Sequence, residues 1–338
     1  MDSGVKRYFL RRAMLSIVVL LGVTVITFTI ARLLPSDPAA RWVGPRATPE
    51  QVEKARVELG LNEPLHIQYL RYISNVFQGN LGVSIRTHSP VLQDIMTFLP
   101  SSLELIISGI IIALIVGIPL GVVSATKKET ILDHLSRIFS IVGVSTPAFW
   151  LGIMLQLLFF KQLGILPLGG RLDINVELNR ITGFYVVDSL ISGNWIAFQS
   201  ALTHLILPAL TMAAYPIGLV TRMIRATMSE VLDEDYIRTA KAYGVPERTI
   251  HYVYALKNSA GPMIMVLALS FAYSLTETFL IEAVFNWPGL GYYASTAILS
   301  ADFPAIVGIT IFMSIFYIII NFTVDIIQAI LDPRIRLG

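Results

Sequence analysis

Few side chains in this 338-residue sequence have the types and spacing that chemistry needs. There is no Cys, which excludes disulfides, thiolate metal sites and cysteine nucleophiles. No G-x-x-x-x-G-K phosphate loop occurs, so we do not expect the chain to hydrolyse ATP itself. No H-E-x-x-H pair occurs either, and His204 is predicted to be a hydrogen-bonded structural residue. The scattered histidines are His66, His88, His134, His204 and His251. We therefore predict no catalytic, cofactor-binding or metal-binding residue.

Gly289, Gly291 and Ala294 have the spacing of a dinucleotide-binding fingerprint. They lie in a link between two apolar runs, with no strand before them and no α/β unit around them. We therefore interpret Pro288-Gly289 as a turn beside helix ends and not as part of a nucleotide site.

The most informative polar stretch covers residues 222–261. Its acidic residues Asp233 to Asp235 suit the start of a helix, Gly244 suits the left-handed turn that ends one, and Pro246 suits the start of the next. Such a helix–turn–helix either docks a partner or forms a solvated loop, and these features alone favour neither. The candidate docking residues are Asp235, Tyr236, Arg238, Thr239, Ala240, Lys241 and Gly244.

Ionisable side chains are nearly absent from the interior of the apolar runs. Glu277 lies about 28 Å along its predicted helix from Asn258, close to the far end, and Asp325 ends another run. A proton-driven carrier usually keeps such residues at mid-membrane depth, so if the chain is a transporter, we expect its energy to come from elsewhere. The remaining polar side chains of the third and fifth runs either line a passage or bond helix to helix. These candidates are Ser145, Thr146, Gln156, Ser270, Tyr273 and Ser274.

The composition places these residues in a membrane protein. The chain is 54% hydrophobic and only 14% charged, whereas a soluble domain is about a quarter charged. Its net charge of +2 and lack of a basic stripe give no indication of nucleic acid. Uncharged runs long enough to span a bilayer predict six helices, and Gly117 and Gly121 predict close helix packing in the second. The runs are 13–31, 105–126, 138–160, 205–221, 258–276 and 303–324.

Lys and Arg predict the orientation. They are concentrated at the N-terminus, after the second run, after the fourth run and in the tail, so both termini are expected in the cytoplasm. The predicted parts are a first span in 1–31, an external segment in 32–99, a membrane core in 100–331 with a cytoplasmic loop in 222–257, and a cytoplasmic tail in 332–338.

The segment 32–99 is predicted to contain two short amphipathic helices. Thr48 and Gln51 form a capping-box pattern, and Gly60 can end the helix that follows. A second helix is expected to start near Pro64. We expect a small cap on the membrane helices, with substrate contact as the alternative.

In the polar stretch 222–261 and in further motifs along the chain, the sequence resembles the permease subunits of ABC importers, in the dipeptide, oligopeptide and nickel family. The stretch 235–244 is similar to the family's coupling loop, although only Ala240 and Gly244 fit its general Glu-Ala-Ala-x-x-x-Gly form. Asn80 stands where Asp is usual, and Glu277 where Gly is usual. The resemblance covers nearly the whole chain. Further matching motifs are Leu59-Gly60-Leu61, Gln68-Tyr69-Leu70, 79–84, Gly169-Gly170-Arg171, Thr182-Gly183-Phe184-Tyr185, Leu207-Pro208-Ala209-Leu210, Glu282-Ala283-Val284-Phe285, 287–291 and Asp332-Pro333-Arg334.

The resemblance implies an all-α, multi-pass protein of the prokaryotic plasma (inner) membrane. It implies a heterodimer with a second permease, two cytoplasmic ATPase subunits that carry ATP and Mg, and an external solute-binding protein. The implied cargo is a dipeptide or oligopeptide, with nickel chelates or oligosaccharides as alternatives. A self-sufficient channel, a secondary carrier or an intramembrane enzyme agrees less well with the charge-poor spans and the missing catalytic pairs.

Overall fold

A computed structural model describes residues 3–33, 37–44 and 46–331. Within these residues the chain is helical apart from loops and one isolated bridge between Val83 and Pro90, so the all-α prediction is confirmed. The predicted tail 332–338 lies outside the described residues. The chain divides into two compact units, one of residues 1–99, 293–322 and 333–338, the other of 100–292 and 323–332.

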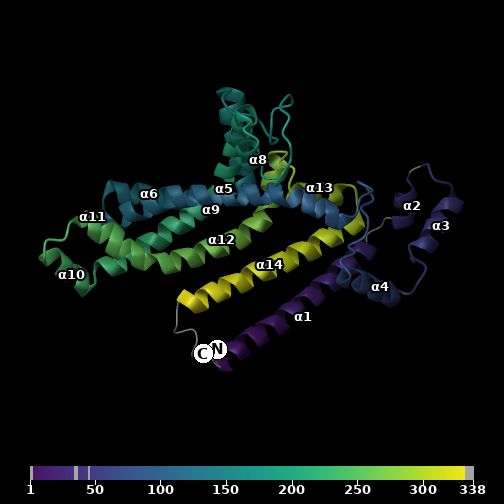
Figure 1. Cartoon of the computed structure of the whole chain (residues 1–338), viewed down its shortest axis with the longest axis horizontal. Coiled ribbons are helices and arrows are strands. Elements are labelled where there is room, and N and C mark those ends of the chain that lie inside the picture. Colours follow the sequence, from purple (N-terminus) through teal and green to yellow (C-terminus); the bar gives the residue numbers. More distant parts are fainter. Residues whose placement is uncertain (1–2, 34–36, 45, 332–338) are drawn as a thin grey trace. The chain divides into compact units, whose positions relative to one another are not determined.

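In the first unit, short helices follow a long apolar one (Figure 1). Helices α3 and α4 lie where the two short helices were predicted. Thr48 accepts a hydrogen bond from the Gln51 amide, the Gln51 side chain accepts one from the Thr48 amide, and Gly60 takes a positive φ of 64°. The fourth helix begins after Pro64, as predicted. The bounds are α1 Ser3–Leu33, α2 Pro38–Val43, α3 Pro49–Glu58 and α4 Leu65–Phe77. The unit also holds the beginning of α5 and most of α13 and α14.

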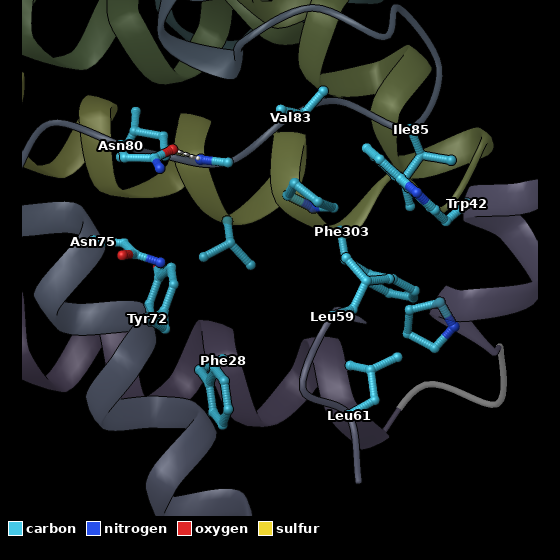
Figure 2. A pocket seen from close by; sticks show the side chains of 15 residues that line it. Phe28, Trp42, Leu59, Leu61, Tyr72, Asn75, Asn80, Val83, Ile85 and Phe303 are labelled. Atoms are coloured by element: carbon cyan, nitrogen blue, oxygen red, sulfur yellow. Dashed lines mark hydrogen bonds between the residues drawn. The ribbon is translucent and has the colours of Figure 1, made fainter. Parts of the chain in front are cut away.

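Figure 2 shows an apolar cavity of about 440 Å³ within this unit. Phe28 of α1, Trp42 of α2, Tyr72 of α4 and Phe303 of α14 line it. Asn80 at its edge accepts a hydrogen bond from the Gly82 amide at 2.9 Å through its side-chain oxygen. An Asp carboxylate can accept the same bond, which explains why Asn fits where Asp is usual.

The second unit contains long helices joined by short ones. Figure 1 shows α10 and α11 at the connection between α9 and α12. The bounds are α5 Val91–Thr126, α6 Ile131–Ser145, α7 Ala148–Leu155, η1 Gln156–Gln162, α8 Tyr185–Ile191, α9 Trp195–Leu232, α10 Asp235–Ala242, α11 Glu247–Thr249, η2 Ile250–Ala255, α12 Leu256–Val284, α13 Leu290–Leu299 and α14 Phe303–Leu331.

Four helical segments of the described chain are long and apolar enough to cross a membrane, namely 91–126, 195–232, 247–284 and 303–326. The apolar stretch Met14–Ile30 of α1 is shorter. The third predicted span was expected to be one helix over 138–160, and this is wrong. It is a pair, α6 and α7, that bends by 107° at Thr146-Pro147. Pro147 cannot donate to the helical ladder and disfavours a helical residue before it, so the helix breaks there. Counted as one span, the pair gives up to five such segments.

Helix α9 forms the centre of the second unit and packs against α6, α7, α8 and α12. Glycines of α5 let that helix approach α9 closely. A Cβ on Gly117 would lie 3.0 Å from the Val220 Cβ, and one on Gly121 would lie 2.7 Å from the Ile224 Cβ. The predicted role of Gly117 and Gly121 in close packing is therefore confirmed.

Candidate functional site

The segment between α9 and α12 is a short, exposed and well-ended helix. Helix α10 begins at Asp235, directly after Glu234, and ends in a Schellman motif. The Val245 amide donates to the Ala240 carbonyl at 3.1 Å, and the Gly244 amide donates to the Lys241 carbonyl at 3.0 Å. Gly244 has a φ of 76°, as the sequence predicts. The loop 222–257 therefore contains a compact helical element.

Most docking candidates lie on the free surface of α10. Asp235, Tyr236, Arg238, Thr239, Lys241 and Gly244 are exposed, and Ala240 is half-buried. Ile237 is fully buried, and the Asn258 side chain donates to the Tyr236 hydroxyl at 2.7 Å. These two contacts hold the helix against the rest of its unit.

Arg225, near the end of α9, pairs with a carboxylate of α6. Its guanidinium donates to the buried Asp133 carboxylate at 2.9 and 3.1 Å. Asp133 also accepts from Ser124 at 2.5 Å. Arg225 therefore joins α9 to α6, and the attachment of α10 depends on Ile237 and Tyr236 instead.

The bend between α6 and α7 brings together three of the six predicted passage residues. Ser145, Thr146 and Tyr273 line one cavity of about 210 Å³ within the second unit. Tyr215 of α9 also lines it, and its ring centroid lies 5.0 Å from that of Tyr273. Glu277 lines the same cavity, one helical turn after Tyr273.

The other three candidates lie elsewhere. The Gln156 amide donates to the carbonyls of Leu168 at 2.7 Å and Val284 at 3.1 Å, so it ties a loop to the end of α12. Ser270 and Ser274 are buried in α12 and do not line this cavity. The passage role of all six residues stays a prediction.

Sequence reasoning missed Glu277, Thr211 and Tyr215 as lining residues. Glu277 was placed by its distance along a straight helix, which does not reveal that a neighbouring span breaks beside it. The Thr146-Pro147 pair was the available signal for that break.

A second cluster, around Arg171, gives a structural reason for the motifs Gly169-Gly170-Arg171 and Thr182-Gly183-Phe184-Tyr185. Arg171 and Glu104 are buried and form an ion pair with 2.5 Å between Nη2 and Oε2. Arg171 also donates to the Ser101 hydroxyl at 2.6 Å and the Gly183 carbonyl at 2.8 Å, and its guanidinium carbon lies 3.5 Å from the centroid of the Tyr185 ring. Burial lowers the pKa of Arg171, and the Glu104 carboxylate opposes this shift.

Glu282 fixes the start of α13. It is fully buried, accepts from the Ser102 hydroxyl at 2.5 Å and from the Tyr292 amide at 2.9 Å. A side chain on Gly289 would collide with this carboxylate, and one on Gly291 would collide with the backbone of Phe279. The glycines of the fingerprint-like segment therefore permit close packing on α12, in agreement with the rejection of a nucleotide site.

No group of three His, Cys, Asp or Glu side chains with metal-binding geometry occurs in the described part of the chain. His204 is buried, and its Nδ1 lies 2.8 Å from the Ser200 carbonyl, in agreement with a structural role.

A bent apolar helix pair, long apolar helices and a projecting helix between two of them define a multi-pass membrane permease. Residues 117–337 match the family described as the binding-protein-dependent transport system inner membrane component, and residues 5–106 match its N-terminal domain. The chain belongs to this family of inner-membrane permease components.

Its curated relatives are similar along nearly their whole length. The chain is 48% identical over 323 residues to the probable D,D-dipeptide transport system permease protein DdpB of Escherichia coli K12, which covers 95% of each chain. It is 39% identical over 329 residues to the dipeptide transport system permease protein DppB of Alkalihalophilus pseudofirmus, covering 97% of this chain and 99% of the relative. It is 33% identical over 330 residues to the oligopeptide transport system permease protein AppB of Bacillus subtilis, covering 97% and 99%.

Proposed function

We propose that this chain forms half of the passage of an ATP-driven importer for peptides, with dipeptides as the favoured cargo. The observation that carries the proposal is the 48% identity along 95% of the chain to a permease named for D,D-dipeptide transport. Other relatives are also named for dipeptides or oligopeptides, which favours peptides over nickel chelates or oligosaccharides.

In the proposed complex this chain contacts three further kinds of protein subunit and the membrane. These are a second, similar permease, two cytoplasmic ATPase subunits that bind ATP and Mg, an external solute-binding protein and the lipid bilayer. The family description supports the binding protein directly, because it names transport that depends on one. The proposed orientation, with both termini and α10 in the cytoplasm, is supported by the distribution of Lys and Arg.

Helix α10 is the proposed contact with an ATPase subunit. Closure of the ATPase must move something rigid, because a slack loop would absorb the displacement. The Schellman end, the buried Ile237 and the Tyr236–Asn258 bond give α10 this rigidity. Its exposed Asp235 and Arg238, which pair at 3.2 Å, leave a charged surface for the partner.

The test uses two variants of the importer reconstituted with all its subunits in proteoliposomes. Gly244→Val imposes a β-branched residue at φ 76°, which strains the backbone, and its side chain meets no atom of this chain within 4 Å of the Cβ, so it would also thicken the contact face. Ala240→Trp leaves helix geometry intact and thickens the outer surface. We expect Ala240→Trp to insert normally, to lose ATPase copurification and to lose dipeptide uptake together with peptide-stimulated ATP hydrolysis.

Unchanged assembly, hydrolysis and uptake in Ala240→Trp would show that α10 is not the docking surface. A Cys introduced at position 240 should react with impermeant thiol reagents only from the cytoplasmic side, and reaction from outside the cell alone would overturn the proposed orientation.

A further inference from the structure

The cavity at the α6–α7 bend contains an acidic side chain that no described residue of the chain pairs with. Glu277 is the one charged residue among the described residues that line this cavity. The other polar lining groups are hydroxyls, from Ser145, Thr146, Thr211 and two tyrosines. Glu277 belongs to an apolar segment, 247–284, that is long enough to cross the membrane.

Glu277 has no hydrogen bond or ion pair to any residue that the structure describes, and it is half-buried. Glu282, five residues further along the same helix, has both carboxylate oxygens bonded. An ionisable group in a membrane segment is costly unless it is paired or faces water or a bound ligand. Glu277 therefore has capacity for a cationic partner that the described residues of its own chain do not use.

The backbone around the cavity comes from both sides of the helix break. Gly143 to Ser145 line it with the C-terminus of α6, and Pro147 and Ala148 line it with the N-terminus of α7, so the two helix dipoles oppose each other and favour neither sign of charge. Because the helix breaks at Pro147, its terminal carbonyls are not continued into a regular ladder. A carboxylate, carbonyls and hydroxyls together form an acceptor-rich site, which suits an ammonium group, a donor of three hydrogen bonds.

We propose that Glu277 binds the amino-terminal ammonium group of the peptide as it passes through this permease. This inference depends on the proposed function, since it takes a peptide as the cargo. Tyr273 lies one turn before Glu277, and its ring is tilted by 32° against that of Tyr215, so its hydroxyl and ring form the adjoining wall. The carboxylate makes the site selective for cargo with a free amino terminus over cargo without positive charge at that position.

The test compares variant importers with the wild type in proteoliposomes that contain the complete complex and the same peptide-loaded binding protein. The variants are Glu277→Gln, Glu277→Asp and Glu277→Lys, with Glu177→Gln as the matched control. Glu177 is exposed and does not line the cavity, so the control removes one negative charge by the same isosteric change. Initial uptake of a labelled dipeptide, basal ATP hydrolysis and copurification of the partner permease are measured for each.

We expect uptake to fall in the order Glu, Asp, Gln, Lys, with a loss of at least about tenfold for Gln, the scale of a hydrogen bond to a charged group. Basal hydrolysis and copurification should stay at the wild-type level, as should every property of Glu177→Gln. The isosteric Gln separates charge recognition from packing, because a packing role predicts that Gln behaves like Glu.

Two results would overturn the inference. One is wild-type uptake by Glu277→Gln. The other is loss of the partner permease from that variant, which would mean that Glu277 pairs with a cation of the second permease. Failure of the proposed function is distinguishable, because the wild-type importer itself would then take up no dipeptide.

Discussion

Breaking the buried pair between Arg171 and Glu104 should destabilise the protein more than removing the charge of any exposed side chain does. Both side chains are at most 5% exposed. Arg171→Met would leave the Glu104 carboxylate buried with only the Val186 amide as a donor, at 2.8 Å. Removing one member of such a pair typically costs about 3–5 kcal/mol. For a chain of this size, that corresponds to a fall of roughly 5–10 °C in apparent unfolding temperature.

The double variant Arg171→Met with Glu104→Leu tests the cause. With both charges gone, the remaining cost is the loss of the Arg171 bonds to Ser101 and Gly183 and of the Val186 bond, about 1–3 kcal/mol. The two single costs add to about 6–10 kcal/mol, so the double variant should be more stable than additivity predicts by about 3 kcal/mol or more.

The assay measures the unfolding temperature of the purified importer in detergent. Unfolding is monitored as the loss of the monodisperse peak of the importer. Lys161→Met, which removes an exposed cation of the same unit, should shift the temperature by about 1 °C or less. Additive losses in the double variant would refute the reasoning, because the two charges would then not compensate each other.

Two more perturbations follow from single contacts. Gly117→Leu should cost about 1–3 kcal/mol or prevent assembly, since its Cβ alone would lie 3.0 Å from Val220, and this is measured by the same unfolding assay. Burial raises the pKa of Asp188, but hydrogen bonds from the Thr182 side chain and from three backbone amides lower it below its ordinary value. The stability from this depressed pKa is present above about pH 4 and is lost as the pH falls through the folded-state value. Asp188→Asn should therefore have a lower unfolding temperature at pH 7. In a pH series, its unfolding temperature should fall less steeply on the acid side than that of the wild type.

The elements that the sequence predicts well are those whose signals are local. Thr48 with Gln51, Gly60, Pro64 and Gly244 each specify a cap or turn through their own backbone and side chain, and each is found as expected. Apolar runs likewise predict spans, because the bilayer requires length and composition only.

The elements that the sequence predicts poorly depend on partners far away in the chain. Arg171 and Glu104 are 67 residues apart, and Arg225 and Asp133 are 92 residues apart. Nothing in the neighbourhood of either arginine identifies its carboxylate, so neither pair could be predicted from the sequence. The bend at Pro147 was missed because a proline within an apolar run is compatible with both a kinked span and a broken one.

The two carboxylates of α12 show why burial alone does not identify a functional acid. Glu282 is the more buried, yet each of its oxygens accepts a hydrogen bond and the adjoining glycines fit around it, so it holds α13 in place. Glu277 is more accessible but has no partner in its described surroundings, and it faces a cavity formed where a neighbouring helix breaks. An acid that already accepts hydrogen bonds from its own chain gains less free energy by binding a cation than an unpaired one in an apolar segment does. The chemistry of passage is therefore expected at Glu277, where the packing of the chain leaves a charge unpaired.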